Sequence, residues 1–322
     1  MNNKAIVLYS GGLDSLLALH IALRLGLEVS ALFIKTPFYK KDIKSLRDNL
    51  EKLNIKLYVA EIDNAYLNIL KNPTYGFGKN LNPCLDCRIM MFSEAKKLME
   101  NLSASFIITG EVLSQRPFSQ RNKANILLIE KKSQLENLVL RPLSAKLLPP
   151  TLAEIEGIVD RSKLYAISGR SRKPQLALAK LFNIERFETP SGGCLLTEPY
   201  FANRLRNFLD LDLLEHYKLA HIGRHFKIND NLLIVARQQN EFDIIASYKN
   251  IFDFFETKDS PGTCAIFLKQ STQNEKMLAS KIVLRYSKKA KSVLCFSNGN
   301  CQLFEDLELI EENKLMELRV EG

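Results

Sequence analysis

The 322-residue sequence predicts an α/β protein in which a doubly wound parallel sheet is followed by a smaller α+β domain. Short apolar runs alternate with helical patterns in the first part of the chain, an order that is typical of parallel sheets. From about His221 the pattern changes to short strand-like runs separated by turns. We therefore expect an α/β domain over 1–198, a helical linker over 199–220 and an α+β domain over 221–322.

Apolar runs and helical spacing define the elements of the first domain. The apolar runs predict strands at 5–9, 29–34, 56–62, 105–109 and 138–143. Apolar residues spaced by three and four predict helices at 16–24, 43–53, 88–102 and 151–159. Because ligands of such sheets bind at the carboxyl ends of the strands, the loops after residues 9 and 109 are expected to share one cleft.

The second domain is predicted from shorter and more varied runs. A helix over 200–209 leads into it, a longer helix over 273–286 interrupts the strands, and the acidic tail 305–322 is expected to be helical. Strand-like runs occupy 225–228, 232–236, 242–246, 264–269, 292–296 and 301–304, with Asn298-Gly299 as a hairpin turn before the last.

The composition restricts the class of protein. The chain carries 45 Lys and Arg against 36 Asp and Glu, a net charge of +9. This charge favours an anionic partner, nucleic acid first, over a basic surface that serves solubility alone. No apolar run approaches the ~20 residues that span a membrane, and no signal peptide is visible. We expect a cytoplasmic protein without a membrane partner, whose six cysteines form no disulfide framework.

The turn after the first strand, Ser10-Gly11-Gly12-Leu13-Asp14-Ser15, combines the features of an anion site. Two glycines let successive N–H groups face one point, and the start of the next helix adds unpaired N–H donors. Ser10 and Ser15 add hydroxyl donors. A phosphate is the expected ligand, and Asp14 then needs a cation or a reacting group between itself and the phosphate. The Lys of a Walker A loop and the G-x-G-x-x-G spacing are both absent.

These six residues resemble the pyrophosphate loop of the PP-loop ATPases, which cleave ATP between the α and β phosphates and adenylate a substrate. Further motifs resemble the core of the tRNA 4-thiouridine synthases and the two cysteine loops of the related tRNA 2-thiouridylases, over roughly residues 1–198. These motifs are Thr109-Gly110-Glu111 with Gln115 and Ser119-Gln120, Leu140-Arg141-Pro142-Leu143, Asn82-Pro83-Cys84 and Ser191-Gly192-Gly193-Cys194.

Residues 221–270 resemble the NFACT-type RNA-binding domain instead. The resemblance lies in Gly223-Arg224-His225-Phe226, Ala236-Arg237-Gln238-Gln239-Asn240 and Ser260-Pro261-Gly262. The sequence also departs from the 4-thiouridine synthases, because their amino-terminal RNA-binding domain and carboxy-terminal rhodanese domain are not evident. Glu111 stands where Asp is expected. The modified uridine and the source of the sulfur are therefore open.

The resemblance implies an ATP-dependent tRNA sulfurtransferase that makes 4-thiouridine or 2-thiouridine. The uridine carbonyl oxygen would attack the α-phosphate of ATP, pyrophosphate would leave into the Ser10–Ser15 turn, and sulfide would displace AMP. Asp14 and Glu111 are the expected ligands of Mg²⁺, which prefers carboxylate oxygens. Gly110 would lie against the nucleotide, and Gln115 would position the base.

Two other functions stay open on the sequence alone. A PP-loop ligase that adenylates a small metabolite, with zinc at its cysteines, would not need a basic second domain. An RNA-binding protein that has lost catalysis would not need the intact loop with Asp14. The sequence also leaves a homodimer open, and it does not identify the sulfur donor, which is sulfide or a persulfide carrier.

Three cysteines are candidate catalytic groups and metal ligands. Cys84 and Cys87 form a C-x-x-C pair at the start of a helix, where thiolates have a lowered pKa, and Cys194 follows two glycines. They resemble the iron–sulfur branch of the tRNA thiolases, in which a [4Fe–4S] cluster with three Cys ligands keeps one iron open. A persulfide relay and a zinc site completed by Asp86 or His221 are alternatives. The remaining cysteines are expected to be buried and inert: Cys264, Cys295 and Cys301.

Basic residues supply the candidate contacts to tRNA, the expected partner. The segment from Arg161 to Arg186 holds seven basic residues and a single acid, the most uneven charge distribution in the chain. Phosphate contacts from Lys and Arg would fix the position of the RNA. The candidates are Arg170, Arg172, Lys173, Arg204, Arg206, Arg224 and Lys227.

Overall fold

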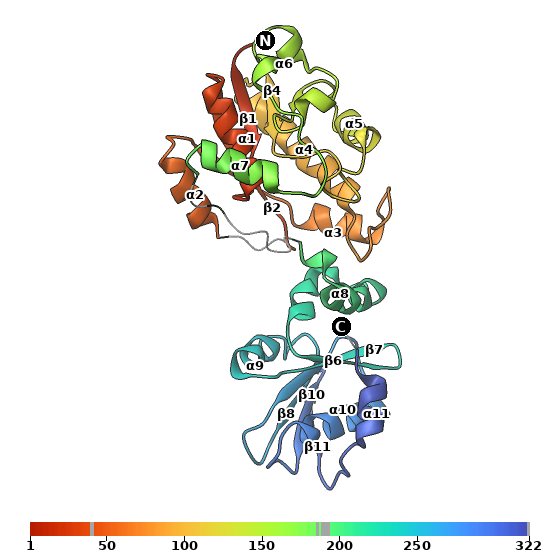
Figure 1. Cartoon of the computed structure of the whole chain (residues 1–322). Coiled ribbons are helices and arrows are strands. Elements are labelled where there is room, and N and C mark those ends of the chain that lie inside the picture. Colours follow the sequence, from red (N-terminus) through yellow and green to blue (C-terminus); the bar gives the residue numbers. More distant parts are fainter. Residues whose placement is uncertain (39–41, 185–186, 188–193, 321–322) are drawn as a thin grey trace. The chain divides into compact units, whose positions relative to one another are not determined.

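The computed structural model describes residues 1–38, 42–184, 187 and 194–320, which form two compact units (Figure 1). The first unit runs from Met1 to Thr197 and the second from Glu198 to Gly322. Each unit has its own sheet and its own apolar core. The predicted fold class, a parallel α/β sheet followed by a smaller domain, is confirmed.

The sheet of the first unit is parallel throughout, with the strand order β3-β2-β1-β4-β5. The order places β1 at the centre, where apolar residues are buried on both faces. The change in direction of the chain from β1–β2–β3 to β4–β5 lies between β1 and β4, so the carboxyl ends of these two strands flank the site position of a doubly wound sheet. The strands are β1 Lys4–Leu8, β2 Glu28–Lys35, β3 Leu57–Glu61, β4 Phe106–Thr109 and β5 Val139–Leu140.

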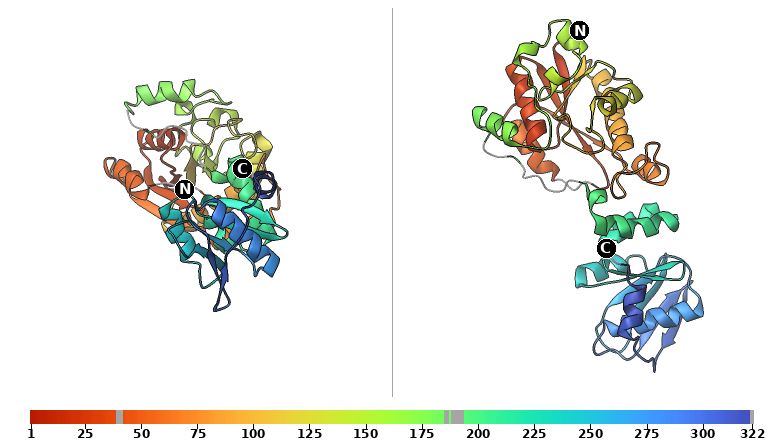
Figure 2. Two further views of the ribbon diagram at one scale, coloured as in Figure 1. Left: turned by 90° about the horizontal axis from the view of Figure 1, so that it is seen from below. Right: turned by 45° about the vertical axis from the view of Figure 1, so that its right-hand side comes forward.

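Helices cover both faces of this sheet (Figures 1 and 2). On β1, Ala5 and Val7 face a core shared with α1 and α7, while the alternate side chains of β1 face the layer in which α4 packs with α5. The helices are α1 Leu13–Arg24, α2 Ile43–Glu51, α3 Asn64–Lys71, α4 Cys84–Asn101, α5 Lys123–Lys132, α6 Leu152–Ile155 and α7 Lys173–Leu181. Short 3₁₀ turns lie at η1 Ala145–Leu147, η2 Arg161–Lys163 and η3 Leu195–Thr197.

The second unit is built on an antiparallel sheet of the order β11-β10-β8-β9-β7-β6. Helices α10 and α11 supply side chains to the core on one face. Helix α9 covers the other face, where the thiol of Cys264 lies 3.8 Å from the carbonyl oxygen of Phe242. The elements are α8 Pro199–Asp210, η4 Leu214–His221, β6 Arg224–Ile228, β7 Asn231–Val235, α9 Gln239–Ala246, β8 Asp253–Thr257, β9 Cys264–Phe267, α10 Gln273–Arg285, β10 Val293–Ser297, β11 Asn300–Phe304 and α11 Glu312–Leu318.

Three sequence predictions of elements are wrong in detail. The run 242–246 belongs to α9 rather than to a strand, because a short apolar run fits either element and here Glu241 and Ile245 are buried one helical turn apart. The strand that the sheet uses instead is β8, which the sequence analysis missed. The helix predicted over 151–159 is only the single turn α6, since Gly157 adopts a left-handed φ of +74°. In the acidic tail, the helix is confined to α11.

A buried ion network ties the carboxyl ends of β4 and β5 to the helices beside them. Arg141, which follows β5, donates to Glu111 Oε2 at 3.0 Å and to Glu130 of α5. Arg88 of α4 lies 3.4 Å from Glu111 Oε1. Burial alone would raise the pKa of Glu111, but the guanidinium groups of Arg88 and Arg141 outweigh it and hold this pKa below its usual value. The pKa of Glu130 is raised, because burial there outweighs the attraction of Arg141.

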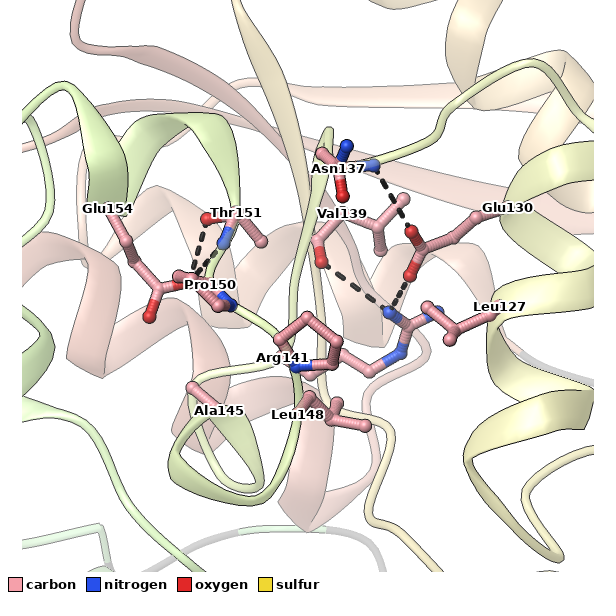
Figure 3. A pocket seen from close by; sticks show the side chains of 11 residues that line it. Leu127, Glu130, Asn137, Val139, Arg141, Ala145, Leu148, Pro150, Thr151 and Glu154 are labelled. Atoms are coloured by element: carbon pink, nitrogen blue, oxygen red, sulfur yellow. Dashed lines mark hydrogen bonds and ion pairs between the residues drawn. The ribbon is translucent and has the colours of Figure 1, made fainter.

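Figure 3 shows Arg141 between Glu130 and the carbonyl of Val139. These residues line a cavity of about 20 Å³. Such a volume has room for about one water molecule. One nitrogen of Arg141, Nη2, is buried without a hydrogen-bond partner, so a single water there would complete its bonds. The cavity is too small for a substrate, and we place the functional site elsewhere.

We expect Arg141→Met to lower the free energy of unfolding by about 3–5 kcal/mol, because Glu130 would remain buried without a counter-charge and Glu111 would keep only Arg88. The matched control is Lys35→Met, which removes a solvent-exposed ion pair with Glu61 at 2.8 Å and should cost less than about 1 kcal/mol. Urea denaturation at pH 7 measures both variants. Equal losses in the two variants would show that the buried network contributes nothing particular to stability.

Candidate active site at the carboxyl end of the parallel sheet

The turn between β1 and α1 is held by its own serines. Gly11 adopts a φ of +75°, a left-handed conformation that favours glycine. The hydroxyl of Ser15 donates to the carbonyl of Gly12 at 2.9 Å and accepts the N–H of Ser10 at 3.2 Å. Ser15 therefore shapes the turn, in addition to the donor role predicted from the sequence. Gly12 caps α1 without a side-chain bond, so the turn keeps the unpaired N–H groups of the helix start available to an anion.

Gly110 packs directly on this turn. A Cβ atom at Gly110 would lie 2.3 Å from the carbonyl carbon of Asp14 and 2.5 Å from the nitrogen of Ser15. Real Cβ atoms do not approach backbone atoms this closely, so only glycine fits here. The loop after β4 and the start of α1 therefore lie in contact at one edge of the sheet, as the sequence predicts for loops that follow neighbouring parallel strands.

Asp14 and Gln115 meet across this contact. The side-chain amide of Gln115 donates to Asp14 Oδ2 at 3.0 Å. The other carboxylate oxygen, Oδ1, is buried and has no hydrogen-bond partner. A buried carboxylate oxygen without a donor is costly unless a ligand satisfies it. Asp14 thus fits the Mg²⁺ or reacting group expected between this residue and a phosphate.

Glu111, the second Mg²⁺ ligand that the sequence predicts, lies buried between two guanidinium groups. Its side chain is 2% exposed, and its two oxygens face Arg141 and Arg88. Oε2 accepts a hydrogen bond from Arg141, whereas Oε1 is buried without a hydrogen-bond partner and has only the ion pair with Arg88. The structure gives Glu111 the role of fixing the loop that carries Gly110 and Gln115.

Two hydrogen bonds bring the Cys194 segment to the Cys84–Cys87 helix across more than a hundred residues of sequence. The N–H of Leu195 donates to the carbonyl of Phe38 at 3.0 Å. The side chain of Asn80, in the loop before α4, donates to the carbonyl of Thr197 at 2.7 Å. Within the described residues, this places Cys194 close to the start of α4.

Each thiol of the C-x-x-C pair has a polar side chain beside it. Cys84 is the first residue of α4, and the amide of Asn82 donates to its Sγ at 3.1 Å. Tyr66 of α3 is hydrogen-bonded to Cys87, and its ring packs against Phe38 with 5.5 Å between centroids. The sequence analysis missed Tyr66, which belongs to no recognised motif, and used Asn82 only as part of the Asn82-Pro83-Cys84 resemblance.

The charges of the three thiols would act on one another and on Tyr66. The pKa of Tyr66 is raised well above its usual value, first by burial and then by the charges that Cys87, Cys194 and Cys84 would carry. Burial, followed by the neighbouring Cys87, raises the pKa of Cys194 to about 12. Burial also raises the pKa of Cys87, against the opposing effects of Tyr66 and Arg88. The predicted lowered pKa is therefore wrong for Cys87, because loss of hydration outweighs the helix start.

The thiols fit an iron–sulfur cluster in donor type and neighbourhood, although their side chains do not surround a common point. Among the described residues, no group of three Cys, His, Asp or Glu side chains is arranged as a set of metal ligands. A complete zinc site would need a fourth ligand. Asp86 is occupied, because its oxygens accept the N–H groups of Thr74 and Tyr75 at 2.9 and 3.2 Å. His221 belongs to the second unit, where its ring stacks on Phe201.

The three cysteines of the second unit differ in exposure. Cys264 and Cys295 are buried in the second unit, as predicted. Cys301 is exposed, so the prediction of a buried thiol is wrong for this residue. It lies in the edge strand β11, in which Asn300 to Leu303 are all exposed.

We expect iodoacetamide at pH 7 to modify Cys301 before Cys87 and Cys194 in the reduced, metal-free protein, because these two thiols are less exposed and keep their protons. Raising the pH should accelerate modification of Cys87 and Cys194, since their pKa values are raised and the reactive thiolate grows with pH. Peptide mass spectrometry follows each site. Modification of Cys194 at the rate of Cys301 at pH 7 would contradict the protonated state of Cys194.

The basic segment after η2 reaches the same edge of the sheet. The N–H of Gly169 donates to the carbonyl of Leu113 at 2.7 Å, beside the loop that carries Gln115. Arg170 and Lys173 are exposed, and Arg172 is half-buried. Arg186 and the Ser191-Gly192-Gly193 part of the cysteine loop lie outside the described residues.

The RNA candidates of the second unit differ in exposure. Arg206 and Lys227 are exposed, whereas the guanidinium of Arg224 lies over the ring of Tyr286, 4.4 Å from its centroid. Arg204 is 4% exposed and donates to the Tyr200 hydroxyl and to the Gly223 carbonyl. Arg204 therefore stabilises the fold and cannot contact a phosphate, so this prediction is wrong. Four further exposed lysines of this unit were not among the predicted RNA contacts: Lys258, Lys288, Lys289 and Lys291. The last three are close together in the sequence.

Comparisons with known proteins also separate the first part of the chain from the second. Residues 1–160 match the family described as thiamine biosynthesis protein (ThiI). The first unit holds a ThiI-family domain. Residues 223–300 match the NFACT protein RNA binding domain. Both resemblances predicted from the motifs are thus confirmed. None of the helices in the described part of the chain has the length and apolar content needed to cross a bilayer.

The curated relatives match only part of this chain, and the match covers only part of each relative. A tRNA-specific 2-thiouridylase MnmA of Sulfurimonas denitrificans is 31% identical over 35% of this chain and 36% of its own length. A probable tRNA sulfurtransferase of Methanosarcina acetivorans is 29% identical over 51% of this chain and 39% of its own length. The chain therefore spans less than half the length of these curated relatives.

Solved structures with similar folds have low similarity scores. A 4-thiouridine synthetase–RNA complex with bound ATP has a TM-score of 0.36 and 21% identity, over 57% of this chain and 54% of that one. The U34-tRNA thiolase NcsA from Methanococcus maripaludis, with its [4Fe-4S] cluster, has a TM-score of 0.31 and 15% identity, over 68% and 72%. The fold assignment therefore rests on the sheet topology itself.

Proposed function

We propose that this protein is an ATP-dependent tRNA sulfurtransferase that replaces a uridine carbonyl oxygen with sulfur. The observation that carries the proposal is the unpartnered, buried Oδ1 of Asp14 at a glycine turn that leaves N–H groups for a phosphate. The match of residues 1–160 to the ThiI family and the names of the tRNA-modifying relatives support the choice of substrate.

The reaction divides into activation and displacement. The uridine carbonyl oxygen attacks the α-phosphorus of ATP, the bond between the α-phosphorus and the bridging oxygen breaks, and pyrophosphate leaves. The turn that begins at Ser10 would hold the pyrophosphate through its N–H groups, and Asp14 would hold the Mg²⁺ that accompanies it. Sulfide then attacks the activated carbon of the ring, a C–S bond forms, and AMP leaves with the original oxygen.

Gln115 would keep Asp14 in place. Its amide is bonded to Asp14 Oδ2, which leaves the other oxygen directed to the ligand. This is a different role from the predicted contact with the base. Gly110 would hold the two loops together, because its backbone lies against Asp14 and Ser15.

The three thiols would hold the sulfur-transfer group. Cys84, Cys87 and Cys194 supply three sulfur donors, which suits a [4Fe–4S] cluster with one iron free of protein ligands. A bound cluster would present the sulfide that replaces the carbonyl oxygen. Tyr66 and Asn82 would then donate hydrogen bonds to two of the ligating sulfurs, as they already do to Cys87 and Cys84.

We propose that tRNA reaches this edge along the exposed basic residues Arg170 and Lys173, with the half-buried Arg172 between them. In the second unit, Arg206, Arg224 and Lys227 remain proposed contacts. Nucleoside analysis of tRNA from cells that lack the gene would assign the position, because 4-thiouridine and 2-thiouridine separate by chromatography although their masses are equal.

We expect Asp14→Asn to reduce tRNA-dependent pyrophosphate release by roughly 100-fold or more, since a charge that stabilises the reacting phosphates is lost. The control is Asp63→Asn at the exposed start of α3, which makes no capping bond and should retain full activity. Unfolding midpoints of both variants verify that the fold is intact. Normal pyrophosphate release by Asp14→Asn would remove Asp14 from the mechanism, and release without tRNA would favour a small-metabolite ligase.

We expect Cys84→Ser, Cys87→Ser and Cys194→Ser each to remove both the brown colour and the thiolation activity of protein reconstituted without oxygen. The wild type should carry about four irons, as one cubane cluster requires. The matched controls Cys264→Ser, Cys295→Ser and Cys301→Ser should retain both properties. A colourless wild type that thiolates tRNA from a persulfide donor would replace the cluster by a persulfide relay.

A further inference from the structure

Two segments of the second unit run side by side and carry a group of exposed lysines. The N–H of Lys258 donates to the carbonyl of Ser292 at 3.2 Å, and the N–H of Thr263 donates to the Ser287 hydroxyl at 3.0 Å. A Cβ at Gly262 would lie 2.6 Å from that hydroxyl, so the loop and the segment are packed closely. The exposed lysines on them are Lys258, Lys288, Lys289 and Lys291.

A groove of about 460 Å³ opens beside these lysines. Its lining combines the half-buried ring of Phe242, the amide of Gln239 and the hydroxyl of Ser260, whose oxygen is buried without a hydrogen-bond partner. An aromatic ring with polar groups around it is the kind of surface on which unpaired bases stack and form hydrogen bonds.

The acidic residues that line the groove do not neutralise the lysines. Glu256 is paired with Lys249, whose Nζ lies 3.0 Å from its carboxylate. Asp259 accepts the backbone N–H groups of Lys291 and Ser292 at 2.8 and 3.3 Å. Asp259 keeps its negative charge, but the four exposed lysines outnumber it, so the surface next to the groove is net positive and complementary to a phosphate backbone.

We propose that this groove binds single-stranded RNA of the tRNA substrate, with a base stacked on Phe242 and neighbouring phosphates on Lys288, Lys289 and Lys291. The inference rests on the proposed tRNA sulfurtransferase function and places a second RNA contact in the second unit. The surface differs from Arg206, Arg224 and Lys227, the contacts predicted from the sequence.

Filter binding of the full-length protein to an unmodified tRNA transcript, at several salt concentrations, tests the proposal. Replacing Lys288, Lys289 and Lys291 together by Ala should weaken binding and reduce the slope of log K against log salt by about one unit for each phosphate that the variant no longer binds. The matched control replaces the exposed Lys218, Lys269 and Lys314 by Ala, which removes the same charge elsewhere in the unit. The control should keep the wild-type slope.

A second variant separates stacking from charge. Phe242→Leu keeps an apolar side chain in the groove but removes the aromatic face, so affinity should fall by about fivefold or more while the salt slope is unchanged. Equal slopes for the two lysine variants, or wild-type affinity in Phe242→Leu, would overturn the proposal. If the lysine effect is found but the wild type does not thiolate tRNA, the proposed function fails and the RNA-binding surface stands.

Discussion

The buried guanidinium of Arg141 is the constraint on which the arrangement of the first unit depends. It joins Glu111, after β4, to Glu130, on α5. Glu111 in turn faces Arg88, the residue after Cys87 on α4. A single chain of charges therefore connects the loop that touches Asp14 to the helix that carries two thiols. Because each buried charge needs its partner, a shift of helix α4 would disturb the loop that packs on Asp14.

The parallel sheet was predictable because its strands are short apolar runs, although helices α3, α5 and α7 were not predicted. The elements of the second unit were harder to predict from the sequence. An apolar run of five residues at 242–246 fits a helix or a strand, and only packing on β9 decides between them. Strand β8 was missed because its acidic residues, Asp253 and Glu256, interrupt the apolar pattern.

For the site, the sequence identified residue types but not their exposure. Asp14, Gly110 and Gln115 were found from their motifs, and the structure brings them together. Glu111 and Arg204 were assigned to a metal and to RNA because they are charged, but each is buried against opposite charge or hydrogen-bond partners. Tyr66 was not predicted, because its hydrogen bond with Cys87 forms only when α3 packs beside α4.

The protonated state of Cys87 and Cys194 affects how the site can be loaded. In the proposed cluster each of these residues would bind iron as a thiolate and would therefore release a proton as iron arrives. Assembly should therefore become easier as the pH rises and should acidify a weakly buffered solution. The same protons slow attack on the sulfur by peroxides, because oxidation proceeds through the thiolate. The metal-free protein would thus be protected against oxidative damage during the interval between its synthesis and the delivery of iron.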